Sequence, residues 1–452
     1  MKRSLLLYVF VAALGGFLFG FDTAVINGAL PFFRDYFQLD KVMEGWAMSS
    51  AIFGCLVGAI GIGKPADIYG RRSMLKVMAA LFLISAIGTG TSTHITSFIV
   101  FRIIGGVAVG GSSVLSPMYI SEIAPAKFRG RLAITFQLAL VIGILIAFAT
   151  DLALINTGVN NWRWMFISEA GPAILFFILL FLVSQSPRWL VKTGNYEKAR
   201  FVIEKVNPTT DSNKLLQEIK DSIDSEVVEH FKNLFKKPYL RLVIIGILIG
   251  MFNQTTGIAV VMIYSSDIFR AAGFGTESAI LQTVIVGFTN LTFTIIAMTL
   301  IDKIGRKLLL LLGSVGMTIF LGLFSYVFFF DIGGFLPLIF MISFVACFAF
   351  SQGAVVWVLF AEMFPNNIRS RGVSIGSFSH WVFYAILLFF FPVIRKSFSD
   401  NSGIGYIFAF FAFATLISYF FYKKFIVETK GKTLEEIEKD WSIRKKKPLD
   451  RK

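Results

Sequence analysis

Cysteine, histidine and charged residues are scarce in this chain of 452 residues. It has two cysteines, Cys55 and Cys347, and three histidines, and 16% of its residues are charged. Two cysteines that each lie inside an apolar run exclude a disulfide framework and a cysteine-based metal site. The chain also has no Gly-x-x-x-x-Gly-Lys-Ser/Thr stretch, which disfavours an ATP-driven machine. The three histidines, His94, His230 and His380, lie far apart in the sequence. We therefore expect that the protein is not an enzyme and that it binds no metal and no organic cofactor.

Most of the chain consists of apolar residues. Hydrophobic side chains make up 56% of the chain, and the mean hydropathy is +0.72. Apolar runs of about 20 residues recur, which is the length that crosses a hydrocarbon core of about 30 Å. We therefore predict an all-α membrane protein with twelve transmembrane helices. Their expected ranges are 5–33, 44–63, 74–92, 97–123, 131–155, 162–184, 240–270, 278–301, 307–330, 335–361, 372–395 and 403–424.

The net charge of +15 is concentrated in alternate loops and in the tail. This is the positive-inside pattern, which predicts that both termini lie in the cytoplasm. The basic run at 444–447 is interpreted as a solvated tail near anionic lipid, and we expect no nucleic-acid partner. The basic segments are 64–76, 127–131, 188–241, 303–307, 369–371 and 423–452.

Two motifs occur twice in the same order along the chain. The first reads Asp, two residues, Gly, Arg and a second basic residue, with Asp67 and Arg71 in "ADIYGRRSMLK" and Asp302 and Arg306 in "IDKIGRKLLLL". A duplicated six-helix unit explains this order, and parallel repeats of this kind are typical of the major facilitator architecture. The predicted organisation is a first half at 1–184, a helical cytoplasmic linker at 185–239, a second half at 240–424 and a cytoplasmic tail at 425–452.

The second repeated motif places an acid before a proline and an arginine, in "SEIAPAKFRGR" and in "AEMFPNNIRSRG". Arginines at cytoplasmic helix ends alone would only follow the positive-inside pattern, but that pattern does not explain an acid at fixed spacing in both halves. We predict a charge network that closes and opens a cytoplasmic gate at a cost of a few kcal/mol. The expected gate residues are Asp67, Arg71, Glu122, Arg129, Asp302, Arg306, Glu362 and Arg369.

Five stretches in order resemble the sugar porter family of the major facilitator superfamily. They are "GFLFGFDTAVING" (16–28), residues 102–131, "SPRWLVKTGNYEKA" (186–199), "VWVLFAEMFPNNIRSRG" (356–372) and "VETKGKTLEEIE" (427–438). The resemblance covers nearly the whole chain, and it implies a sugar transporter with alternating access that functions as a monomer in the lipid bilayer.

The resemblance also implies binding residues. Gln137, Gln254, Trp357 and Trp381 match family positions that contact sugar, and amide and indole groups suit sugar hydroxyls and C–H faces. Two neighbouring residues depart from the family pattern. Asn253, just before Gln254, stands where a glutamine is usual, and His380, just before Trp381, stands where a glutamine often occurs. We count both as candidate binding residues, and the sugar is left open among hexoses, pentoses and polyols.

Asp22 is an isolated acid in an apolar, glycine-rich span. An ionisable residue inside a span is a functional hypothesis by default. Arg102, in the fourth span, is its expected partner, and the pair is predicted to couple sugar import to a proton, as in bacterial proton-coupled sugar symporters. The alternatives are a structural ion pair, a passive sugar facilitator and a non-transporting sugar receptor. The expected location is the plasma or inner membrane, and the coupling ion is the proton.

Overall fold

The structure, a computed structural model, describes residues 3–125, 128–206, 211–224, 234–235, 239–365, 368–398 and 402–430. Within these residues the long regular elements are α-helices. In the first half they are α1(Arg3–Ala24), α2(Ile26–Tyr36), α3(Lys41–Gly61), α4(Gly63–Tyr69), α5(Arg71–Thr91), α6(Ile95–Ile123), α7(Arg129–Leu154), α8(Asn161–Ser168) and α9(Ala170–Leu179). The central segment forms α10(Pro187–Lys192), α11(Tyr196–Val206) and α12(Ser212–Asp224). The second half forms α13(Leu240–Thr255), α14(Ile258–Ala271), α15(Thr276–Ile304), α16(Arg306–Phe329), α17(Leu336–Phe350), α18(Gln352–Met363), α19(Arg369–Arg395) and α20(Ser402–Phe425).

Among the described residues, twelve helical stretches are long and apolar enough to cross a membrane, which confirms the expected number of spans. Four of these stretches consist of two helices that meet at a break. The breaks fall at Val25, at Glu169, at Thr256 and Gly257, and at Ser351. Gly257 has φ +85°, a conformation that side chains with a Cβ rarely adopt. Each break interrupts the regular pattern of backbone hydrogen bonds inside a span, where only protein or a water-filled cavity can satisfy the freed groups.

The helices group into two compact units. Unit 1 comprises Met1–Glu226, Met262–Asp267 and Gly275–Gly287, and unit 2 comprises Val227–Val261, Ile268–Phe274 and Phe288–Lys452. Hydrogen bonds explain why a piece of α14 belongs to unit 1. The Asn27 amide donates to the carbonyl of Met262 at 2.8 Å and to Oγ of Ser265 at 2.8 Å. Arg34 on α2 adds an ion pair with Asp267 at 3.1 Å.

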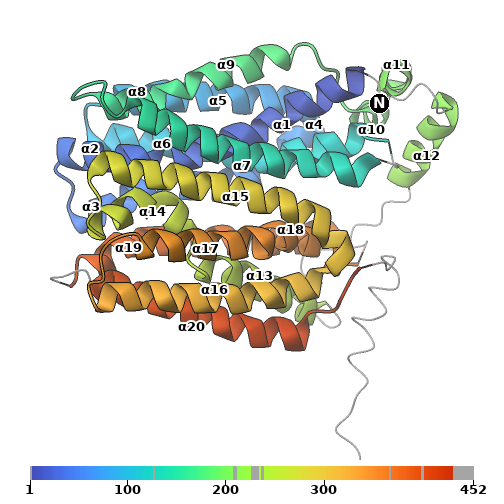
Figure 1. The fold of residues 1–452 in the computed structure, drawn as a ribbon. Coiled ribbons are helices and arrows are strands. Elements are labelled where there is room, and N and C mark those ends of the chain that lie inside the picture. Colours follow the sequence, from blue (N-terminus) through green and yellow to red (C-terminus); the bar gives the residue numbers. More distant parts are fainter. Residues whose placement is uncertain are drawn as a thin grey trace, which may run out of the picture. The chain divides into compact units, whose positions relative to one another are not determined.

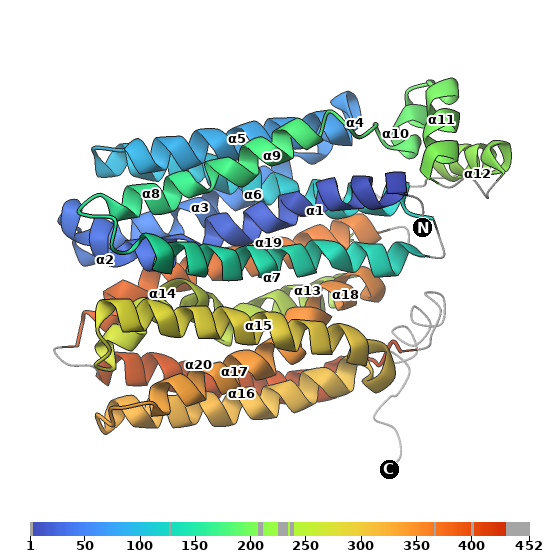
Figure 2. The ribbon, with the colours of Figure 1, turned by 45° about the horizontal axis from the view of Figure 1, so that its top comes forward.

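Glycines allow the closest helix pair of unit 1. Gly54 and Gly58 on α3 face Gly106 and Gly110 on α6, and a Cβ on any of them would overlap backbone atoms of the opposite helix. Small residues at four-residue spacing are the usual means by which membrane helices approach closely. Figure 2 shows the other neighbours in this unit, with α5 beside α9 and α1 beside α7.

The central segment packs on unit 1 as short helices. Figure 1 shows α10, α11 and α12 clustered next to the N-terminus of α1. The apolar side of α11 is buried through Ala199, Val202 and Ile203, and Ser4 donates from Oγ to the carbonyl of Lys205 at 2.5 Å. The part of the predicted linker that the structure describes is thus helical over Pro187–Lys192, Tyr196–Val206 and Ser212–Asp224.

Unit 2 is held together by a core of aliphatic and aromatic side chains from α13, α16, α18 and α20. Within it, α16 lies beside both α17 and α20 (Figure 2). Phe252 on α13 packs against Phe421 on α20, with ring centroids 5.1 Å apart and the rings tilted by 42°. This packing fixes α13, the helix that carries Asn253 and Gln254.

Candidate functional site

The intramembrane acid of α1 has the partner that was expected from the sequence. Arg102 donates from Nη1 to Oδ1 of Asp22 at 2.7 Å and from Nη2 to the main-chain carbonyl of the same residue at 3.1 Å. Both side chains are almost fully buried, with 1% exposure for Asp22 and 2% for Arg102. The second carboxylate oxygen of Asp22 has no hydrogen-bond partner. The pair thus balances one charge against another while one oxygen stays available.

A second acid, Glu169, lies at the same place. It occupies the break between α8 and α9 and is buried, close enough to interact electrostatically with both Asp22 and Arg102. The Phe166 ring centroid lies 5.5 Å from the guanidinium carbon of Arg102. Two carboxyl groups facing one arginine form a site that can hold a proton between them. The sequence analysis missed Glu169, although it stands in the apolar run "WMFISEAGPAILFF" and the rule that singled out Asp22 also applies to it.

The candidate sugar-binding residues of unit 2 form one cluster. Gln254, on α13 near the break to α14, places its amide nitrogen 3.0 and 3.1 Å from the two ring nitrogens of His380 on α19. The amide nitrogen also lies 3.4 Å from Oδ1 of Asn253. The amide oxygen of Gln254 is buried without a hydrogen-bond partner. A buried amide with a free acceptor is suited to a hydroxyl donor from a ligand.

Aromatic side chains border this cluster. The ring centroid of Trp357 on α18 lies 5.1 Å from that of His380, and the ring centroid of Trp381 lies 5.4 Å from it. Tyr384, which was not singled out from the sequence, stacks on Trp381 at 5.9 Å with an interplanar angle of 6°. Trp357 is 38% exposed whereas Trp381 is buried, so Trp357 presents the more accessible indole face.

Gln137 belongs to unit 1, where it lies half-buried on α7. Its proposed action together with the residues of unit 2 stays a prediction. Among the described residues no group of three or more histidine, cysteine, aspartate or glutamate side chains is placed to hold a metal ion.

The first copy of the repeated charge motif is joined by ion pairs. Arg71, the first residue of α5, pairs through Nη1 with Asp67 at 3.0 Å and through Nε with Glu122 at 3.1 Å. The connection before α5 turns at Gly70, which has φ +87°. One arginine at the start of α5 thereby ties α4 to the end of α6.

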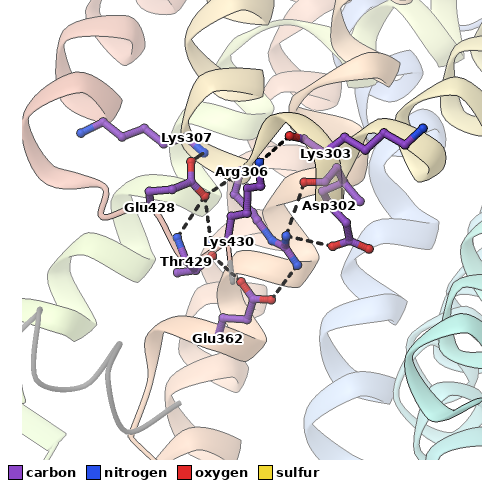
Figure 3. A network of polar contacts seen from close by, with 9 residues as sticks. Asp302, Lys303, Arg306, Lys307, Glu362, Glu428, Thr429 and Lys430 are labelled. Carbon is purple, nitrogen blue, oxygen red and sulfur yellow. Dashed lines mark hydrogen bonds and ion pairs between the residues drawn. The ribbon is translucent and has the colours of Figure 1, made fainter. Parts of the chain in front are cut away.

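The second copy repeats this geometry (Figure 3). Arg306, the first residue of α16, pairs with Asp302 at 3.0 Å and with Glu362 at 3.1 Å. Glu362 in turn accepts a hydrogen bond from Oγ1 of Thr429 at 2.6 Å. The preceding Gly305 has φ +99°, like its counterpart in the first copy. The equivalence of the two networks gives the sequence repeat a structural counterpart.

The other two arginines of the predicted gate, Arg129 and Arg369, each stand at the first residue of a helix. Arg129 begins α7, and its side chain lies outside the described part of the chain. Arg369, which begins α19, donates from Nε to the carbonyl of Phe364 at 3.2 Å. Its neighbourhood is therefore the connection between α18 and α19.

Each network includes a third segment that the sequence analysis did not assign to it. In unit 2 the carboxylate of Glu428 accepts backbone hydrogen bonds from Arg306 at 2.9 Å and Lys307 at 3.0 Å, at the N-terminus of α16. In unit 1 the corresponding position at α5 is taken by a neutral amide, because Gln185 accepts from the backbone of Arg72 at 3.1 Å. The two halves thus differ in the charge placed at equivalent helix N-termini.

Comparison with known proteins identifies the class of molecule. Residues 8–441 match the family described as "Sugar (and other) transporter". A glucose transport protein of Synechocystis is 40% identical over 96% of this chain and 97% of its own length. The arabinose-proton symporter of Bacillus subtilis is 38% identical over 95% of this chain and 93% of its own length.

A solved structure agrees with these relatives. The xylose transporter XylE of Escherichia coli, in an inward-open conformation, matches with a TM-score of 0.86 and 35% identity over 97% of this chain and 100% of that one. These family and structural neighbours are transporters and not enzymes. The chain is a multi-pass membrane protein that belongs to the sugar transporter family of the major facilitator superfamily.

Proposed function

We propose that the protein imports a sugar together with a proton by alternating access. The observation that carries this proposal is the buried pair of Asp22 and Arg102 with Glu169 beside it. A purely structural ion pair needs one acid for one arginine, whereas this site holds a second carboxyl that can take up a proton. Several relatives are named as sugar-proton symporters, including those for arabinose and D-xylose, which supports the same assignment.

The proposed sugar site includes Gln137, Asn253, Gln254, Trp357, His380 and Trp381. The amide oxygen of Gln254 and the exposed indole of Trp357 offer a hydroxyl acceptor and an apolar face in one place. The substrate class is a hexose, a pentose or a polyol. Protons serve as the coupling ion, and no organic cofactor takes part.

The two charge networks around Arg71 and Arg306 are proposed as the cytoplasmic gate, with Arg129 and Arg369 contributing at the neighbouring helix ends. The distribution of basic loops favours cytoplasmic termini in a plasma or inner membrane. We propose that the functional unit is the monomer surrounded by lipid.

Uptake into proteoliposomes with an imposed pH gradient tests the function. The purified protein should accumulate at least one sugar from a panel of glucose, D-xylose, L-arabinose and sorbitol, and a protonophore should abolish the accumulation. Uptake that equilibrates but never exceeds the outside concentration, with no effect of the protonophore, would identify a passive facilitator. Binding without any uptake would identify a receptor.

A further inference from the structure

Unit 1 buries another acid that the proposed coupling site does not include. Asp151 stands one turn before the end of α7, and its side chain is fully buried. An ionisable side chain inside a membrane span is rare because its charged form loses the solvation of water. Its presence in a fully buried position therefore requires a partner or a function.

Asp151 accepts a hydrogen bond from the backbone of α2. Gly28 donates its amide N–H to Oδ2 of Asp151 at 3.1 Å. Gly28 is the third residue of α2, directly after the break at Val25, where a helical N–H has no partner within its own helix. A Cβ at Gly28 would lie 2.6 Å from the same oxygen, so the glycine is what allows this approach.

No lysine or arginine among the described residues pairs with this carboxyl group, and its other oxygen, Oδ1, has no hydrogen-bond partner. The helices packed against α7 include α1, α2, α6 and α8, and their charged groups are engaged elsewhere. Asp22 pairs with Arg102, Arg34 pairs with Glu44 and Asp267, Glu122 pairs with Arg71, Arg163 donates to the carbonyls of Gly90 and Ser92, and Asp35 is exposed. Glu277, on the part of α15 that belongs to unit 1, is also exposed. Arg3 stands at the start of α1, and Arg129 and Arg131 stand at the start of α7, the end of that helix remote from Asp151.

These surroundings give the carboxyl group two states of different stability. While it is closed off, the neutral acid is favoured, because a buried charge without a cation is expensive. When water reaches it, the carboxylate is favoured, because the N-terminus of α2 stabilises an anion through the Gly28 N–H. The contact therefore links a proton on Asp151 to the position of α2, the helix that continues from Asp22 across the break.

We infer that Asp151 is a second proton-binding site, separate from the Asp22–Glu169 site, which takes up and releases a proton during the transport cycle. This inference rests on the proposed function, since it concerns the same import reaction. Gly28 follows Asp22 by six residues, about 9 Å along a helix, so the two acids are close enough to act on one segment of the chain.

The Asp151→Asn variant tests the inference, because asparagine keeps the size and the acceptor for Gly28 but cannot ionise. It behaves as a permanently protonated acid, so proton-driven uptake should persist to a more alkaline pH than in the parent, while sugar binding stays within about twofold. Infrared difference spectra between acid and alkaline pH should lose one protonated-carboxyl band. Thr150→Val is the matched control, since this neighbouring hydroxyl donates to the carbonyl of Ile146. The control should keep the band and the pH profile of the parent.

An unchanged pH profile or an unchanged infrared spectrum in Asp151→Asn would overturn the inference. If that variant does not fold, Asp151→Glu decides the matter, because it keeps an ionisable carboxyl group at this position but changes its length. A displaced protonated-carboxyl band together with a displaced pH profile supports Asp151, and a spectrum and profile identical to those of the parent refute it. If the parent ignores a protonophore, the proposed proton coupling fails, and the infrared result alone still decides whether Asp151 exchanges a proton.

Discussion

At the scale of single residues, the proposed chemistry depends on polar atoms that are buried without a protein partner. Such atoms are uncommon in folded proteins because each one loses its hydrogen bonds to water. Oδ2 of Asp22, Oε1 of Glu169 and Oε1 of Gln254 are all in this condition. Two of them surround one arginine, and the third lies in the aromatic cluster of α18 and α19. Their positions agree with a proton site and a sugar site that are completed by their ligands.

Gln254→Ala should weaken sugar binding by about 1–3 kcal/mol, because the sugar hydroxyl that donates a hydrogen bond to the amide oxygen would lose its partner. This corresponds to roughly 5- to 150-fold in the dissociation constant. The measurement is equilibrium binding of the sugar that the parent accumulates from the panel. Gln217→Ala, on the polar helix α12, removes an amide outside the spans and should leave the affinity unchanged. Equal affinity in parent and Gln254→Ala would remove this residue from the site.

At the scale of elements, the sequence predicted the spans well, because a helix that crosses the hydrocarbon core must have an apolar run as long as that core is thick. It did not predict the breaks at Val25, Glu169 and Ser351, since a missing backbone hydrogen bond leaves the hydropathy of a segment unchanged. The pair of Asp22 and Arg102 could be predicted because charges inside spans are rare and each requires a partner. Glu169 was missed because the search for a partner ended with a cation. Tyr384 was missed because an aromatic residue one turn after Trp381 is equally typical of a lipid-facing position.

Gln185→Glu should stabilise the first charge network. A carboxylate there would meet the N-terminus of α5 as Glu428 meets that of α16, and a charge at such a position contributes about 0.3–1 kcal/mol. Thermal unfolding of the purified protein in lipid measures the change, with an increase expected for this variant. The matched variant Glu428→Gln makes the opposite exchange in unit 2 and should lower the unfolding temperature. A shift of the same sign in both variants would contradict the equivalence of the two networks.

At the scale of the whole molecule, the duplicated architecture could be derived from two short motifs because each recurs with its charges at equivalent helix ends. The structure gives both copies the same bonding, with one arginine joining an aspartate and a glutamate. The acids around Arg102 and the aromatic cluster near Gln254, in contrast, each belong to one unit only. A symmetric framework therefore carries an asymmetric division of labour, in which unit 1 holds the intramembrane charges and unit 2 the larger part of the proposed sugar site.

Asp22→Asn tests this division of labour. Asparagine keeps the size of the side chain and an acceptor for Arg102 but cannot carry a proton, so unit 2 should still bind sugar while transport loses its energy source. A proton-motive force of about 150 mV provides roughly 3.5 kcal/mol per proton. That energy supports a few hundredfold accumulation for each coupled proton, because about 1.4 kcal/mol corresponds to tenfold. The variant should therefore bind sugar and exchange internal for external sugar, but accumulate none in vesicles with an imposed pH gradient. A variant that still concentrates sugar would reduce Asp22 to a structural partner of Arg102 and would move the coupling to the remaining buried acids.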